Sequence, residues 1–197
     1  MKKGFLIVYS GPSGVGKGTI LKEVLNVKTL KLKYSVSLTS RKPRPGEVDG
    51  KDYFFVTKKE FEKAIKNNEL LEHATFVDNY YGTPKKYVEE MTNKGYNVLL
   101  EIETKGARQI IKKFGDLNVL SIYITPPSIK ELKNRLVLRN TEPMEIINKR
   151  VAKARRELKN LDLFDYVVVN DDLNKAIKEV KTIIKTEMNK TEHVKSK

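Results

Sequence analysis

The 197 residues include 39 Lys and Arg against 25 Asp and Glu, a net charge of +14, and no cysteine. The absence of cysteine excludes a disulfide framework and a thiolate metal site. No stretch approaches the ~20 consecutive apolar residues of a membrane span, so we expect no membrane partner. Residues 1–4 lead straight into an apolar run, which leaves no room for a signal peptide and favours a cytoplasmic protein.

The positive charge would also suit a nucleic-acid-binding protein. The lysines are scattered along the chain, however, aromatic residues make up only 8%, and tryptophan is absent. We therefore expect no nucleic-acid partner, because no stacking platform stands out. Only eight of the 39 basic residues are arginines. An arginine in this chain therefore indicates a place that needs a rigid, bidentate cation.

The opening segment is typical of a phosphate-binding loop. An apolar strand, Phe5–Tyr9, runs into a glycine-rich turn and then into a helix that begins near Lys17. Glycines let backbone N–H groups point at an anion, the helix N-terminus is partially positive, and the lysine reaches the β- and γ-phosphates. The residues predicted to bind ATP here are Gly11, Pro12, Ser13, Gly14, Val15, Gly16, Lys17, Gly18 and Thr19.

One position departs from the common form of this motif. A Ser or Thr should follow the lysine and hold magnesium, but Gly18 stands there and the hydroxyl comes at Thr19. Which groups coordinate a metal therefore stays open, and water ligands are expected.

Helical and strand-like segments alternate along the rest of the chain. Thr57–Glu60 and Ser128–Glu131 are capping sequences typical of helix N-termini. Asn79–Gly82 is predicted to be a turn, Thr83-Pro84 to start a helix, and residues 189–197 to fray. The expected strands cover 35–39, 53–56, 70–77, 97–103, 118–125 and 166–169; the expected helices cover 17–27, 57–67, 104–114 and 172–188, with two more before and after a break at Thr141–Pro143.

This alternation predicts an α/β protein with a parallel sheet covered by helices. The core strands are expected near 5–9, 97–102, 118–124 and 166–169. Ligands on such sheets bind at the carboxyl ends of the strands, where the phosphate loop, Glu101, Glu103 and Asn170 are expected. The division predicted from these patterns is a core of 1–34, 89–125 and 159–197, an insertion of 35–88 with its own small sheet, and a helical block of 126–158.

A second signal lies in the segment Ser37–Tyr53. Arg41 and Arg44 stand three residues apart in a proline-stiffened loop, and together they can hold one phosphate from two sides. The hydroxyl of Tyr53 can add a third contact. The plainer alternative is a basic surface loop.

Together these segments resemble the guanylate kinase family, in order and over about residues 4–185. The resemblance implies a P-loop three-layer core, a small mixed α/β insertion that binds a nucleoside monophosphate, and a helical lid. It also implies transfer of the γ-phosphoryl group of ATP to GMP, with Mg²⁺ as cofactor. The segments that carry it are Gly11–Thr19, Ser37–Tyr53, Glu72 with Tyr80–Thr83, Leu100–Ala107 and Val169–Asp172.

The resemblance assigns roles residue by residue. It implies that Glu72 and Glu103 read the guanine base and that Ser37 and Thr83 meet its oxygen. It places Asn170 near the adenine. Lys105 stands where the family pattern has glutamine, which leaves one contact open. The monophosphate clamp is implied for Arg41, Arg44, Tyr53 and Tyr81, and catalysis for Lys17, Arg41, Arg135, Arg139 and Arg150.

Guanylate-kinase-like domains can also be non-catalytic binding modules, and this reading is the alternative. The loop lysine, both clamp arginines and all the arginines implied for the lid are present, which favours an enzyme. The oligomeric state is not predicted.

Overall fold

The computed structural model describes residues 3–76, 78–114, 118–140 and 142–193. The chain forms two compact units, Met1–Val8 with Leu32–Val119, and Tyr9–Lys31 with Leu120–Lys197. Three expectations fall partly outside the described residues: the last residue of the strand expected at 70–77, Thr141 of the predicted helix break, and the end of the tail.

A five-stranded sheet runs through the fold. Its parallel pairs include β2 with β7 and β8 with β9. All residues of β1 are buried, as are most residues of β7 and β8, which is typical of a parallel sheet with both faces covered. The α/β fold class is therefore confirmed. The strand order is β2 (Leu32–Tyr34), β7 (Asn97–Glu101), β1 (Leu6–Ser10), β8 (Val119–Thr125) and β9 (Tyr166–Val169).

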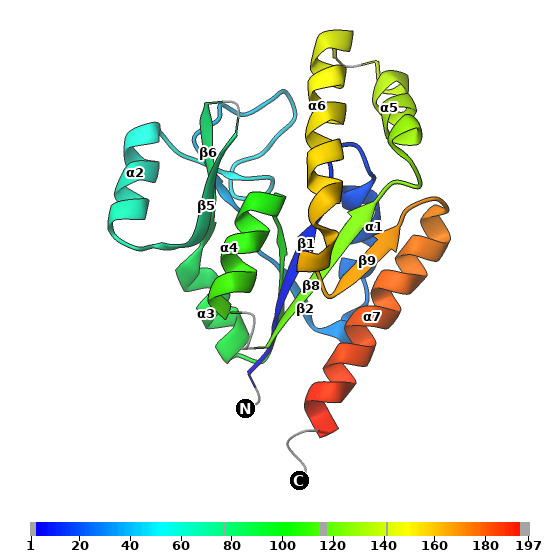
Figure 1. The fold of residues 1–197 in the computed structure, drawn as a ribbon. Coiled ribbons are helices and arrows are strands. Elements are labelled where there is room, and N and C mark those ends of the chain that lie inside the picture. Colours follow the sequence, from blue (N-terminus) through cyan, green and yellow to red (C-terminus); the bar gives the residue numbers. More distant parts are fainter. Residues whose placement is uncertain (1–2, 77, 115–117, 141, 194–197) are drawn as a thin grey trace. The chain divides into compact units, whose positions relative to one another are not determined.

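The first unit also carries a small mixed sheet. In it β3 pairs in parallel with β4 and antiparallel with β6, which in turn pairs antiparallel with β5. Thr57 makes the predicted capping box with Glu60, and the helix that follows buries Phe61 and Ala64. Figure 1 shows α4 alongside β5. The elements are β3 (Leu38–Thr39), β4 (Phe54–Phe55), β5 (Leu70–Phe76), β6 (Asn79–Pro84), α2 (Lys58–Lys66), α3 (Lys85–Asn93) and α4 (Thr104–Phe114).

The second unit is mainly helical around β8 and β9. Helices α1 and α7 pack together, and α5 and α6 form a pair that Figure 1 shows in yellow-green and yellow. Ser128 caps α5 by accepting from the backbone N–H of Glu131, as predicted. The elements are α1 (Lys17–Leu25), the 3₁₀ helix η1 (Lys28–Leu30), α5 (Ile129–Leu138), α6 (Met144–Glu157), the 3₁₀ helix η2 (Leu158–Leu163) and α7 (Leu173–His193).

Three expectations differ from the structure. The turn predicted at Asn79–Gly82 is wrong, because this segment is strand β6 between two partners. The packing around Gly82 is tight, since a Cβ there would lie 2.9 Å from Cδ1 of Leu70 and 3.0 Å from Cζ of Phe61. Strand β2 was not predicted, and the strand expected at 35–39 is formed only at β3. Helix α7 continues to His193, past the expected fraying point.

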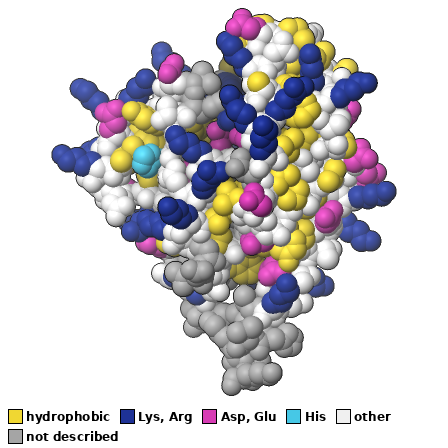
Figure 2. Space-filling view, in the orientation of Figure 1, with side chains coloured by type: hydrophobic (Ala, Val, Ile, Leu, Met, Phe, Trp, Pro, Cys, Tyr) yellow, Lys and Arg dark blue, Asp and Glu magenta, His cyan; other side chains and the backbone are white. Residues whose placement is uncertain are grey.

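The charge is spread widely over the surface. Figure 2 shows Lys and Arg side chains over most of the visible face, interspersed with acidic and apolar ones. In the described part of the chain, no helix is both long and apolar enough to cross a membrane.

Candidate functional site

The phosphate loop of the second unit depends on glycine at close approaches. Gly11 has φ +152°, and a Cβ there would lie 2.3 Å from the carbonyl oxygen of Ile124. Gly16 has φ +96°, and its Cβ would lie 2.6 Å from Nδ2 of Asn170. L-residues rarely adopt such φ values, so the loop backbone can take this course only with glycine.

Lys17 begins α1 and lies across the loop. Its Nζ donates to the carbonyl oxygens of Gly11 at 2.8 Å and of Pro12 at 3.2 Å. The N-cap residue, Gly16, provides no side-chain cap, and the first turn contains no acidic residue. The positive end of the helix dipole and the ammonium group therefore favour an anion at this loop.

Gly18 is not required by the backbone. It lies in α1 without a positive φ, and a Cβ there would meet no atom within 4 Å. Among the described residues there is no group of three or more His, Cys, Asp or Glu side chains that could hold a metal. Thr19 is exposed and carries the first side-chain hydroxyl after Lys17 in α1. This sparse donor set fits Mg²⁺ that is held mostly by nucleotide phosphates and water.

Asn170 ties the loop to the carboxyl ends of β8 and β9. It is 5% exposed, and its Nδ2 donates to the carbonyl oxygen of Val15 at 2.7 Å. Its backbone N–H donates to the carbonyl oxygen of Thr125 at 2.8 Å, and its own carbonyl oxygen accepts from Nη1 of Arg135 at 2.8 Å. Arg135 also pairs with Glu131 at 2.9 Å. The structure thus places Asn170 as a support of the loop, and its role near adenine stays a prediction.

The other predicted lid arginines differ in their surroundings. Arg150 on α6 donates from Nη1 to Oγ of Ser13 at 3.1 Å and pairs with Glu142. Arg139 is the C-cap of α5 and is exposed. The structure therefore brings Arg150 to the phosphate loop, whereas Arg139 lies at the end of its helix. The sequence analysis missed Glu142, for which no local motif provides a signal.

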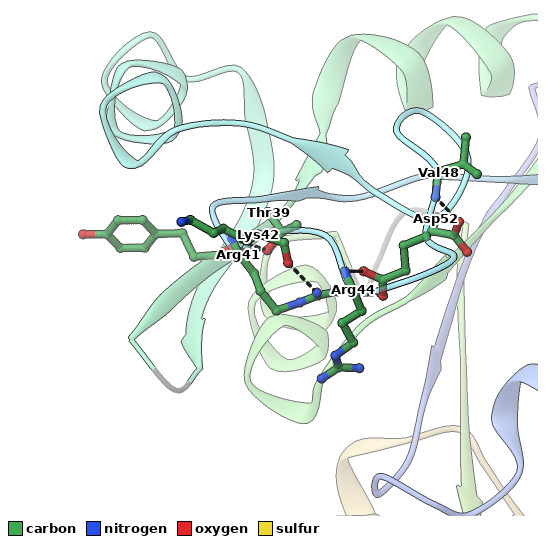
Figure 3. Close-up of polar contacts among 8 residues, drawn as sticks. Thr39, Arg41, Lys42, Arg44, Val48 and Asp52 are labelled. Carbon is green, nitrogen blue, oxygen red and sulfur yellow. Dashed lines mark hydrogen bonds and ion pairs between the residues drawn. The ribbon is translucent and has the colours of Figure 1, made fainter. Parts of the chain in front are cut away.

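The proline-stiffened loop of the first unit is organised by one carboxylate. Nη2 of Arg41 pairs with Oε1 of Glu47 at 2.9 Å, and its Nη1 donates to the carbonyl oxygen of Lys42 at 2.7 Å. Oε2 of Glu47 accepts from the backbone N–H of Arg44 at 2.7 Å. The hydrogen bond from Arg41 lowers the pKa of Glu47 and raises that of Arg41. Figure 3 shows the Arg44 guanidinium extending away from these contacts.

The two tyrosines predicted for the clamp lie near this arginine, and their role there stays a prediction. The Arg41 guanidinium lies 5.4 Å from the ring centroid of Tyr53, and that ring is 6.0 Å from Tyr81 in an edge-on arrangement. Burial raises the pKa of Tyr53. The half-buried Ser37 lies at the start of this segment, where its carbonyl oxygen accepts from the N–H of Phe54 at 2.9 Å.

The same unit holds a buried carboxylate. Glu72 is 4% exposed, and its Oε1 accepts from Oγ1 of Thr83 at 2.7 Å. Burial raises the pKa of Glu72 to about 7, the charge of Glu103 adds to this, and the bonds from Thr83 oppose it. A Cβ on Gly106 would lie 2.3 Å from Oε2 of Glu72, so α4 passes directly against the carboxylate. Glu103 is exposed, just before α4.

A β-bulge directs Glu72 inward. Leu70 pairs with Pro84 and His73 with Gly82, so β5 has one residue more than β6 between these pairs. As a result Leu70, Leu71 and Glu72 are all buried, although strand alternation would expose one of them. His73, the next residue, is exposed. No signal in the sequence marks the bulge.

Comparisons with known proteins agree with one another. The family model described as guanylate kinase matches residues 3–187. The guanylate kinase of Oceanobacillus iheyensis is 51% identical over 193 residues, which cover 98% of this chain and 92% of that protein. The guanylate kinase of Lactiplantibacillus plantarum is 51% identical over 186 residues, 94% of this chain and 89% of the relative.

A solved structure is also similar. The crystal structure of guanylate kinase from Anaplasma phagocytophilum superposes with a TM-score of 0.78 at 34% identity. The superposition covers 94% of this chain and 87% of that one. Both sequence and fold are thus shared along nearly the whole length, and the chain belongs to the guanylate kinase family.

Proposed function

We propose that this guanylate kinase transfers the γ-phosphoryl group of ATP to GMP through the residues described above. The buried Glu72 beside Thr83, in the same unit as the Arg41 clamp, is the observation that supports this most strongly. Together these groups would join a reader of the base to a holder of the phosphate, which is what a nucleoside monophosphate requires.

The base reading follows from hydrogen-bond chemistry. Guanine presents two donors, N1–H and the 2-amino group, and a carboxylate such as Glu72 accepts from both. Adenine has an acceptor at N1 and no 2-amino group, so it would leave a buried carboxylate unpaired. Mismatches of this kind give strong discrimination. Glu103, Ser37 and Thr83 are proposed to complete the contacts with guanosine.

The transfer step needs charge stabilisation more than proton transfer. The phosphate of GMP is already an anion at neutral pH, so no strong general base is required. Positioning and neutralisation of the phosphoryl oxygens then lower the barrier. We assign this to the amides of Gly11–Thr19 and to Lys17, with the arginines at 135, 139 and 150. Mg²⁺ carried in on the ATP phosphates would neutralise further negative charge on the β- and γ-oxygens.

We also propose the division of the chain that the sequence predicts, into a core, an insertion and a lid. Residues 35–88 are the GMP-binding insertion and 126–158 the lid, while the remaining segments form the core. Closure of such parts over substrate excludes water that would otherwise hydrolyse ATP.

A coupled assay of ADP formation with GMP, AMP and UMP tests the proposal. We expect turnover with GMP alone, and Glu72→Gln should weaken GMP selectivity far more than ATP binding. Equal rates with AMP and GMP would overturn the base-reading argument. Binding of GMP without ADP formation would identify a non-catalytic module instead.

A further inference from the structure

Helix α4 holds the edge of the small sheet through one side-chain amide. Nε2 of Gln109 donates to the carbonyl oxygen of His73 at 2.8 Å, and the N–H of His73 donates to Oε1 of Gln109 at 3.4 Å. β5 is the edge strand, so these backbone groups face away from β6. A primary amide offers one donor and one acceptor side by side, and here it takes the place of a neighbouring strand.

This contact lies next to the base-reading carboxylate. His73 directly follows Glu72 and forms the first regular pair after the bulge. On α4, Gly106 precedes Gln109 by three residues, which places both on the same helix face. One face of α4 therefore contacts the bulged part of β5 at two points. Gly106 lies against the carboxylate of Glu72, and Gln109 bonds to the backbone of His73.

A bulge needs such support because its pairing is locally interrupted. A strand that slips by one residue turns its side chains to the other face. We propose that Gln109 is a positioning residue for guanine recognition: it holds the bulged backbone of β5 so that Glu72 meets the base. This inference rests on the proposed role of Glu72.

Comparison of GMP with IMP measures the effect. IMP has the N1–H but lacks the 2-amino group, so only GMP uses the second acceptor contact of a well-placed carboxylate. Gln109→Leu removes both hydrogen bonds at similar volume. We expect the ratio of kcat/KM for GMP over IMP to fall about fivefold, through the KM for GMP, because hydrogen bonds of this kind have modest net effects. The KM for ATP should stay as in the parent.

The matched control is Lys112→Leu, which introduces the same side chain at an exposed position of the same helix. It should leave the GMP/IMP ratio as in the parent. Gln109→Asn retains an amide but shortens its reach, and we expect an intermediate ratio. If the leucine variant does not fold, the asparagine variant replaces it in every comparison.

A double-mutant cycle with Glu72→Gln decides whether Gln109 acts through the carboxylate. In the Glu72→Gln background, Gln109→Leu should no longer change the ratio. A lower Tm with an unchanged ratio, or an equal fall in both backgrounds, overturns the inference. A parent enzyme that does not discriminate GMP from IMP would instead refute the proposed role of Glu72 itself.

Discussion

The phosphate loop and the proposed base pocket, which consists of Glu72 with Thr83 and Gly106, present polar groups in opposite ways. The loop relies on backbone groups, a helix N-terminus and the ammonium of Lys17, all at a partly exposed surface. The base pocket relies on Glu72, a carboxylate that is 4% exposed and held between Thr83 and Gly106. In the proposed function, many small contributions near water would therefore stabilise the phosphates, whereas one desolvated carboxylate would bind the base.

The difference has consequences for stability. Lys17 of the loop is only partly buried, so its replacement should leave the protein folded. Burial of Glu72 raises its pKa to about 7, so its ionised form destabilises the free protein. Specificity at the base is therefore expected to reduce stability, which is common at functional sites.

The largest effect is expected from Lys17→Ala. Loss of the ammonium removes charge stabilisation of the transferring phosphoryl group, and kcat should fall about a thousandfold or more. Nζ donates to the carbonyl oxygens of Gly11 and Pro12, which are neutral acceptors at a partly exposed loop, so Tm should change little. Steady-state kinetics and thermal melts measure both. Lys22→Ala, on the same helix, is the control, and an undiminished kcat would remove Lys17 from the mechanism.

Glu72→Gln tests the cost of the buried carboxylate. Because the folded pKa of about 7 lies above the ordinary value of 4.5, the folded protein binds more protons than the unfolded chain between these values. The stability of the parent should therefore fall as pH rises through this window and level off above it. Across this window the free energy of unfolding of the parent should fall by about 3 kcal/mol relative to that of Glu72→Gln.

Urea denaturation of both proteins at pH 4, 5.5 and 8 measures the difference. The glutamine variant retains an acceptor for Thr83 but carries no ionisable carboxyl group. Its free energy of unfolding should therefore rise relative to that of the parent as the pH increases. Parallel pH profiles for the two proteins would mean that Glu72 is solvated.

Gly106→Ala tests how tightly helix α4 packs against Glu72 in the proposed base pocket. The added Cβ would lie 2.3 Å from Oε2 of Glu72, and the carboxylate or α4 must move. We expect kcat/KM for GMP to fall about thirtyfold, in line with ~2 kcal/mol for overpacking, while the KM for ATP stays within about twofold. Lys112→Ala on the same helix controls for changes in helix stability. An unaffected kcat/KM for GMP would show that the pocket adapts.

Elements with strong local signals were predicted closely. The helix expected at 104–114 is α4, and the capping box at Thr57 is present. Strand β6 was mistaken for a turn because Asn79 and Gly82 are turn-forming residues by local preference. Its identity is decided by the strands that pair with it on both sides, β3 and β5, and Gly82 packs tightly between Leu70 and Phe61.

The sequence by itself determined the α/β alternation, the phosphate loop and the set of arginines, carboxylates and tyrosines proposed for the site. These features can be predicted from sequence because each depends on residue type and spacing within one short segment. Only the tertiary structure decided how Glu72 is buried, at a bulge in β5 and against the close approach of Gly106. Burial and pKa arise from segments distant in the chain, so no local pattern encodes them.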